Sequence, residues 1–169
     1  MVSKPAELFA PVLDLAAAAQ WRKAQRDAGR SVVFTNGCFD LIHAGHIDYL
    51  AWARERGDAL IVGLNTDASV RKIKGERRPL MRFEDRARIL CALRSVDAVV
   101  GFSQATPEVI LEKIQPDVHV KSEQYREDEL PERTVVLSHG GKIALAPHRA
   151  GSSTTALIAA ILRRYTNGG

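Results

Sequence analysis

Apolar residues gather into five short blocks along the chain, each with the length and composition of a buried strand. The blocks are SVVFT (31–35), ALIVGLN (59–65), DAVVGF (97–102), DVHVK (117–121) and KIALAP (142–147). Within a block the apolar residues run on instead of alternating with polar ones, which is typical of strands covered on both faces. The pattern therefore predicts five parallel strands in one sheet.

Between these strands, apolar residues recur at the three- and four-residue spacing of helices. Helices are predicted over 6–26, 43–56, 82–95, 106–116, 131–139 and 152–165. Segment 71–79 is basic and contains a proline, so we expect a loop there. Strands that alternate with helices predict an α/β fold with helices on both faces of the sheet. We divide the chain into a helical lead-in, residues 1–30, and one domain, residues 31–165.

Composition narrows the class of protein. A hydrophobic share of 46% with 26% charged residues excludes a disordered or fibrous chain. The formal net charge of +4 is mild, which favours anionic ligands over nucleic acid. No apolar run approaches the ~18 residues of a membrane span, and the N-terminus lacks the pattern of a signal peptide. Cys38 and Cys91 lack metal-binding spacing and fit reduced thiols, so we expect a cytoplasmic protein.

Two histidines follow the first predicted strand directly, in the stretch TNGCFDLIHAGHIDYL (35–50). His43 and His46 are three residues apart, so they share a face in the first turn of the predicted helix. Unpaired backbone amides and the helix dipole favour an anion at such a turn, and neutral imidazole N–H groups add donors for phosphate oxygens. Gly37 and Gly45 leave room for a ligand to approach. Ligands of parallel sheets bind at this edge, where the strands end.

Three simpler explanations of the histidine pair compete with a phosphate site. A zinc site would need a third ligand and a more usual spacing. The rings could instead be satisfied core residues, or the HxGH pattern could arise by chance. The surrounding sequence favours the phosphate site over these three.

Two further segments carry groups that suit phosphates. HRAGSSTT places Arg149, Gly151 and a row of hydroxyl residues (152–155) at the entry of the last predicted helix. Capping explains one or two of these hydroxyls, whereas four beside an arginine suit a polyphosphate at a helix N-terminus. The basic segment RKIKGERRPL (71–80) fits either a solvated loop or an anion site. A nucleic-acid patch is disfavoured because no aromatic residues are interleaved.

Together these segments resemble the cytidylyltransferase-like nucleotidyltransferase family. TNGCFDLIHAGHIDYL, LIVGLNTDASVRKIKG, RPLMRFEDRARIL and GSSTTALI are most similar to its heptose 1-phosphate adenylyltransferase branch. That branch occurs as a free enzyme or as the second domain of a bifunctional sugar kinase. The resemblance runs from about Val32 to Ile161.

The resemblance implies a Rossmann-like sheet and an in-line attack by a substrate phosphate on the α-phosphorus of a nucleoside triphosphate. His43 and His46 would steady the charge on the α-phosphate, and Lys74 would reach acceptor and α-phosphate oxygens. The floor of the pocket would be formed by Asn36, Gly37, Phe39 and Asp40. Arg86 would contact the acceptor or the phosphates. The β- and γ-phosphates would be held by Ser153, Thr154 and Thr155. Mg²⁺ or Mn²⁺ would be held through the phosphates and water, without a protein cage. A homodimer is expected from the family.

One element departs from the branch. Its Lys-Gly-Gly-Asp-Tyr element stands here as KSEQY (121–125), which keeps Lys121 and Tyr125 as candidate substrate contacts but replaces both glycines and the aspartate. Arg149 stands where the branch often has an apolar residue. In this feature the segment is similar to glycerol-phosphate cytidylyltransferases. The base could therefore be adenine or cytosine.

Three functions remain open at this point. The first is transfer of AMP from ATP to a sugar 1-phosphate, and the second is a CTP-dependent reaction on glycerol phosphate or another polyol phosphate. The third is a nucleotide-binding module without catalysis. Class I aminoacyl-tRNA synthetases carry a similar histidine signature, but 169 residues leave no room for tRNA-reading domains.

Overall fold

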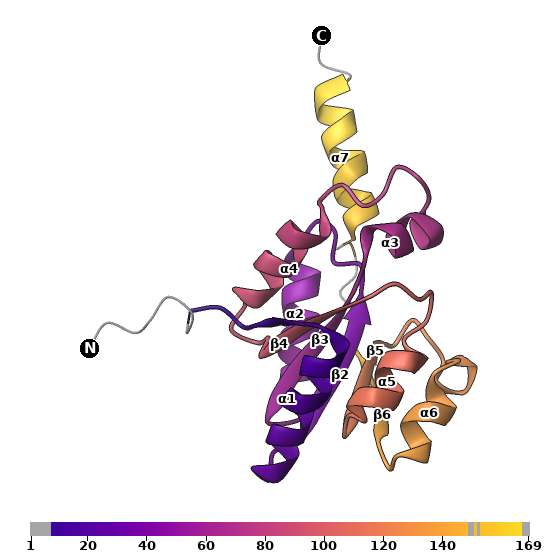
Figure 1. Ribbon diagram of the computed structural model, residues 1–169. Coiled ribbons are helices and arrows are strands. Elements are labelled where there is room, and N and C mark those ends of the chain that lie inside the picture. The colour runs from indigo at the N-terminus through magenta and orange to yellow at the C-terminus, as the bar shows by residue number, and fades with distance from the viewer. Residues whose placement is uncertain (1–7, 149–150, 152, 167–169) are drawn as a thin grey trace.

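The computed structural model describes residues 8–148, 151 and 153–166 (Figure 1). Among these residues, six strands form one sheet in the order β1-β4-β3-β2-β5-β6, and each neighbouring pair is parallel. The strands are β1 (Val12–Leu13), β2 (Val32–Gly37), β3 (Ala59–Asn65), β4 (Ala98–Phe102), β5 (Val118–Ser122) and β6 (Lys142–Ala146). The predicted α/β fold with a parallel sheet is confirmed, and the sheet has one strand more than the five predicted.

Helices connect the strands and cover both faces of the sheet. They are α1 (Leu15–Asp27), α2 (Ala44–Arg54), α3 (Asp67–Lys74), α4 (Phe83–Cys91), α5 (Glu108–Ile114), α6 (Arg133–Ser138) and α7 (Thr154–Thr166), with a short 3-10 helix at Glu127–Glu129. Within the described ranges, none of these helices is long and apolar enough to cross a membrane.

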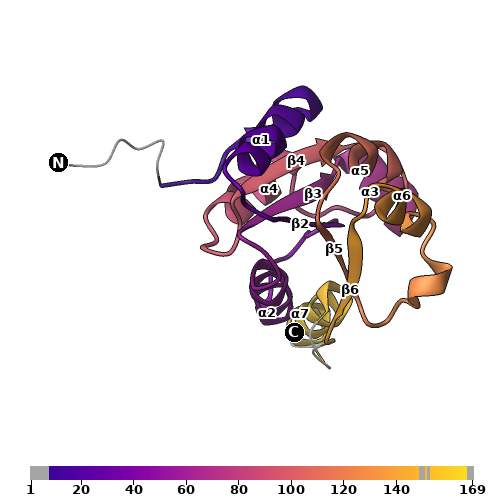
Figure 2. The same cartoon turned by 90° about the horizontal axis from the view of Figure 1, so that it is seen from below.

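The continuous apolar strands are buried on both sides, as their composition predicts. One core cluster packs Leu50 of α2 and Leu90 of α4 against Val33 of β2. The other packs residues of α1, α5 and α6 against Phe34 of the same strand and Ile61 of β3. Successive strand residues point to opposite faces, so adjacent Val33 and Phe34 serve different cores. Figure 2 shows α2 on the opposite side of the sheet from α1 and α5.

The predicted helix over 6–26 is wrong in its first half. Val12–Leu13 form β1, which extends the sheet by pairing with β4, and α1 begins only at Leu15. The Asp14 side chain caps α1 by accepting a hydrogen bond from Ala17 N at 2.7 Å. The extended segment before it satisfies its own backbone against the sheet, because the Pro11 carbonyl accepts from Val99 N. This pairing with a distant strand is invisible to a periodicity count.

The basic segment predicted as a loop is also partly helical. α3 covers Asp67–Lys74 and is opened by Thr66, whose hydroxyl accepts from Ser69 N. The helix ends at Gly75, which has φ of +92°, a conformation that side chains rarely adopt. The remaining residues before α4 form the connection that we call the basic loop, residues 75–82. The many charged residues of this short helix obscured its hydrophobic face, so the sequence pattern predicted a loop.

Candidate functional site

The strand order fixes where a ligand site can lie. From β2 the chain winds outward to β3 and β4, and then returns to place β5 on the other side of β2. The direction of winding therefore changes between β2 and β5. In open parallel sheets, the carboxyl ends of the two strands at such a point flank the ligand crevice. Here those ends carry Asn36 and Lys121.

The two histidines lie directly beyond the end of β2. His43 is the N-cap residue of α2, and its imidazole makes no capping hydrogen bond to the described backbone. The rings of His43 and His46 are stacked, with centroids 3.8 Å apart and planes at 23°. The Nδ1 atoms of both rings are buried without a hydrogen-bond partner among the described residues. The predicted pairing of the rings on one face is therefore present.

Phe39 supports this pair from the side of the sheet. It is buried and has φ of +43°, and its ring lies 5.3 Å from the His46 ring, centroid to centroid. A side chain at Gly37 would put its Cβ 3.0 Å from Cε2 of Phe39. Gly37 is thus needed for the close approach of the Phe39 ring, which in turn braces His46.

Both imidazoles are neutral at physiological pH. Burial and, secondarily, the neighbouring His43 lower the pKa of His46 to about 4, although a hydrogen bond with the Leu41 backbone opposes this. Burial also lowers the pKa of His43. Neutral rings can donate an N–H to a phosphate without the mutual repulsion of two adjacent cations.

Arg86 is placed differently from the sequence prediction, which had it touch the acceptor or the phosphates. It is fully buried on α4, with Nε donating to Met81 O and Nη1 donating to Cys38 O. Nη2 donates to Asn65 O and pairs with Asp67 Oδ1 at 2.6 Å. These partners occupy the ends of β2 and β3 and the start of α3. We therefore assign Arg86 a positioning role at the carboxyl edge of the sheet.

Asp40 has a similar role instead of the predicted contact with the substrate. Its carboxylate is buried and accepts hydrogen bonds from Leu80 N and Met81 N, each at 2.9 Å, and from Arg78 Nε. Burial alone would raise the pKa of Asp40, but these donors hold it below its usual value. Asp40 thereby ties the basic loop to the segment that carries the histidines.

Lys74 ends α3 and is exposed. Burial raises the pKa of the Cys38 thiol, while Lys74 is the first of several cations that lower it in part. The contact of Lys74 with the phosphates stays a prediction.

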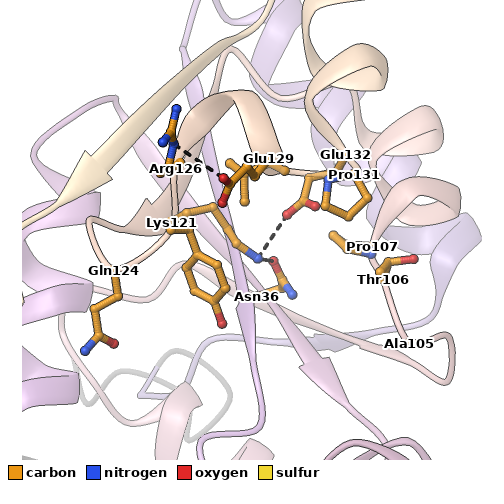
Figure 3. Close-up of a pocket in the computed structure, with 12 residues that line it drawn as sticks. Asn36, Ala105, Thr106, Pro107, Lys121, Gln124, Arg126, Glu129, Pro131 and Glu132 are labelled. Atoms are coloured by element: carbon orange, nitrogen blue, oxygen red, sulfur yellow. Dashed lines mark hydrogen bonds and ion pairs between the residues drawn. The ribbon is translucent and has the colours of Figure 1, made fainter.

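A cavity of about 350 Å³ opens on the other side of Asn36 (Figure 3). Lys121 Nζ lies at the floor of this cavity, 3.5 Å from Asn36 Oδ1 and 2.9 Å from Glu132 Oε1. The Lys121 ammonium also lies 5.1 Å from the centroid of the Tyr125 ring. The cavity is lined by Asn36, Ala105, Thr106, Pro107, Lys121, Gln124, Tyr125, Arg126, Glu129, Leu130, Pro131 and Glu132. Asn36, Lys121 and Tyr125, all predicted site residues, therefore share one mostly polar pocket.

Residues 153–155 of the hydroxyl row stand at the start of α7, whereas Ser152 lies outside the described residues. The Ser153 hydroxyl accepts from Ala156 N at 3.1 Å, which is the capping role expected of one such residue. Thr154 and Thr155 occupy the first turn beside it. Figure 2 shows α7 on the same side of the sheet as α2. The predicted contact from Arg149 lies outside the described residues.

A comparison with known families identifies the chain. The sequence pattern of the family described as cytidylyltransferase-like matches residues 34–160, from the middle of β2 into α7. The chain belongs to the cytidylyltransferase-like family. This match covers the histidine pair, the basic loop, the cavity and the hydroxyl row, so all four lie within the family's conserved domain.

Curated relatives of this cytidylyltransferase-like chain carry the name bifunctional protein HldE. The protein from Geobacter sulfurreducens is 49% identical over 142 residues, which is 84% of this chain and 29% of that protein. The protein from Magnetococcus marinus is 51% identical over 130 residues, or 77% of this chain and 27% of that protein. The chain therefore spans less than a third of the length of the curated relatives it matches.

A solved structure supports the fold. The crystal structure of the lipopolysaccharide core biosynthesis protein from Thermoplasma volcanium superposes with a TM-score of 0.60 at 23% identity. The alignment covers 72% of this chain and 98% of that protein. At this identity the likeness concerns the fold alone, and it confirms the Rossmann-like arrangement of the family.

Sequence reasoning missed two buried polar residues, Glu132 in the cavity lining and its hydrogen-bond partner His119. His119 lies in β5, where its alternation with apolar neighbours suggested only a strand. Glu132 precedes α6, where an acid is ordinarily explained by the helix dipole. A usable signal was the spacing of His119 and Lys121, which puts both side chains on one face of the strand. Their common partner, Glu132, is contributed by a different element.

Proposed function

We propose that this chain transfers AMP from ATP to a sugar 1-phosphate, giving an ADP-sugar and pyrophosphate. The observation that carries the proposal is the stacked, neutral pair His43 and His46 in the first turn of α2, at the strand ends where ligands of parallel sheets bind. D-glycero-D-manno-heptose 1-phosphate is the first candidate acceptor. The motif resemblance and the relatives named bifunctional protein HldE support this choice.

The chemistry needs positioning and charge stabilisation more than covalent help. A phosphate oxygen of the acceptor attacks the α-phosphorus of ATP and forms a new P–O bond. The bond from that phosphorus to the bridging oxygen breaks, and pyrophosphate leaves with the electron pair. His43 and His46 donate N–H groups toward the α-phosphate oxygens, and the Lys74 ammonium offsets their growing charge.

The departing pyrophosphate needs its own site. We assign it to the first turn of α7, where Ser153, Thr154 and Thr155 combine hydroxyl groups with the positive end of a helix dipole. Ser153 uses its oxygen as an acceptor in the cap, so its O–H can still donate to a phosphate. Arg149 is proposed as an additional contact to the same phosphates.

A divalent cation accompanies the triphosphate in this proposal. Across residues 8–148, 151 and 153–166, no group of three or more His, Cys, Asp or Glu side chains could hold a metal ion. Phosphate oxygens and water are the ligands that Mg²⁺ prefers in nucleotide sites. Mg²⁺ or Mn²⁺ would therefore be held through the phosphates, where it neutralises part of their charge.

A CTP-dependent reaction on a polyol phosphate is the second candidate, because the KSEQY segment leaves the choice of base open. Glu123 stands where the adenylyltransferase branch has glycine, and its Oε1 accepts from His148 N at 2.8 Å. Glu123 N also donates to Ala146 O. The segment is thus tied to the connection between β6 and α7 by a side chain that glycine lacks. This change bears on which base the site accepts.

Pyrophosphate release separates these functions. The purified protein is assayed with ATP, CTP or GTP, each combined with heptose 1-phosphate or glycerol 3-phosphate. We expect pyrophosphate release only from the combination of ATP and heptose 1-phosphate. Release from CTP and glycerol 3-phosphate would establish the second candidate. Thermal-shift binding of a nucleotide without release on any acceptor would overturn both in favour of a non-catalytic module. The homodimer stays a prediction, which sedimentation equilibrium would test.

A further inference from the structure

The floor of the cavity contains a buried ion pair that the proposed reaction has not yet used. Glu132 is only 1% exposed, and its Oε1 lies 2.9 Å from Lys121 Nζ and 3.2 Å from His119 Nε2. Glu132 is also the N-cap residue of α6, but its side chain makes no capping hydrogen bond to the described backbone. Helix capping therefore does not explain why a carboxylate is buried here.

The protonation states of the three groups make a consistent chain. Burial alone would raise the pKa of Glu132, but hydrogen bonds from His119 and Lys121 lower it to about 2. Burial lowers the pKa of His119, so this ring is neutral. Because an ionised carboxylate only accepts, His119 Nε2 carries the proton and donates to Glu132. The hydrogen bond from His119 thereby orients the Glu132 carboxylate, whose negative charge pairs with the Lys121 ammonium.

Stability alone is a weak reason to keep such a pair. Removing two charges from water costs about as much as their attraction returns, and apolar replacements of buried pairs are often neutral or stabilising. The pair does determine where Lys121 Nζ lies. That ammonium sits between Glu132 and Asn36, at the point where the sheet changes its winding direction.

We propose that Glu132, backed by His119, is a positioning residue that holds the Lys121 ammonium in the cavity for the hydroxyl-bearing part of the acceptor phosphate. The inference rests on the proposed function, because it assigns the cavity to the acceptor. The fixed N–H donors of Lys121, beside the Asn36 amide, match the hydroxyl oxygens of a polyol. A Lys121 side chain freed from Glu132 would have to be ordered again by each acceptor molecule, which weakens acceptor binding.

The test compares Glu132→Gln with Glu127→Gln. Glu127 lies on the short 3-10 helix outside the cavity lining, is exposed and pairs with Arg133 at 3.6 Å, so it is a matched control. We expect Glu132→Gln to raise the KM for the acceptor about 10-fold or more, by analogy with the loss of other groups that orient a ligand-binding side chain. The KM for ATP should stay within about 2-fold, and Glu127→Gln should change neither value. Equal effects of the two variants would overturn the proposal.

A double-variant cycle separates positioning from general damage to the fold. Lys121→Ala alone should raise the KM for the acceptor, and adding Glu132→Gln should raise it no further, because Glu132 acts through Lys121. Additive effects, or a parallel rise in the KM for ATP, would show that Glu132 only supports the structure. Should Glu132→Gln fail to fold, Glu132→Asp retains the charge on a shorter side chain and is expected to give a smaller rise in the same KM.

A second measurement is independent of turnover. An ammonium group held in an ion pair exchanges its protons slowly enough to be seen by ¹⁵N–¹H NMR, and we expect this signal for Lys121 in the unmodified protein. It should vanish in Glu132→Gln and persist in Glu127→Gln, and its persistence in both would overturn the proposal. Should the unmodified protein release no pyrophosphate, the proposed function fails separately. Calorimetry with heptose 1-phosphate then decides the inference, since binding that does not weaken in Glu132→Gln, or an absence of binding, would overturn it.

Discussion

Lys121 Nζ lies 3.5 Å from Asn36 Oδ1, although 85 positions separate the two residues in the chain. Asn36 belongs to the strand that leads into the histidine pair, and Lys121 belongs to the strand on the other side of the winding change. This contact therefore joins the two parts of the candidate site, with the turn that carries the histidines on one side and the cavity on the other. Attack on a phosphorus requires both substrates to meet at such a boundary.

The histidine pair gives the first prediction. Replacing His46 by alanine should lower kcat about 10²–10³-fold, the usual cost of removing one donor to a developing negative charge. Pyrophosphate release at saturating substrate measures the change. His139→Ala is the control, because His139 is exposed at the end of α6 and should leave kcat unchanged. A His46 variant with normal kcat would remove the ring from the proposed chemistry.

The second prediction concerns the protonation of His46. Its pKa is lowered to about 4 in the folded protein, whereas an unperturbed histidine titrates near ~6.5. The unfolded chain therefore takes up the proton first as the pH falls. The contribution of His46 to stability is complete above about pH 6.5 and is lost progressively as the pH falls toward about 4.

NMR of the His46 ring checks this order. The Cε1–H shift should stay constant between about pH 8 and about pH 5.5 in the folded protein and should titrate near ~6.5 in the urea-unfolded control. A folded-state midpoint near the unperturbed value would contradict the neutral pair on which the proposed phosphate site depends.

Arg86 gives a prediction about stability. Arg86→Met keeps much of the volume but leaves Asp67 and three backbone carbonyls without their donor. Removing one partner of a buried ion pair destabilises a protein by roughly 3–5 kcal/mol. We therefore expect the free energy of unfolding to fall by an amount at the upper end of the range for single substitutions. Urea unfolding followed by circular dichroism measures it. Arg82→Ala, at a 79% exposed side chain, is the control and should change the free energy of unfolding by less than about 0.5 kcal/mol.

Asp40 should control the order of the basic loop. Asp40→Asn removes the charge that holds Arg78 and weakens the acceptor for Leu80 N and Met81 N. Local opening of the loop should then become more frequent, and trypsin should cut after Arg77 about 10-fold faster in the folded protein, because local opening limits such cleavage. Asp85→Asn provides the comparison, because the Asp85 carboxylate pairs with an exposed arginine, Arg82. Equal cleavage rates in the two variants would show that Asp40 does not restrain the loop.

The sequence by itself determined the main strands of the sheet and the pairing of the two histidines at a helix entry. Uninterrupted apolar blocks are buried on both faces in any arrangement, so the five main strands and their parallel pairing followed from composition and spacing. His43 and His46 stand three apart at a helix entry, and local geometry alone puts them on one face. These features depend on neighbours within a few residues, which a linear pattern records.

Tertiary structure decided what the remaining polar residues do. Val12–Leu13 became a strand because β4 offered a free edge, and Arg86 and Asp40 turned inward because distant carbonyls and amides surround them. Glu132 meets Lys121 and His119 only because α6 returns to the end of β5. Whether a charged side chain faces solvent, a ligand or a buried partner depends on groups brought together by the folded chain, and spacing along the sequence carries no record of them.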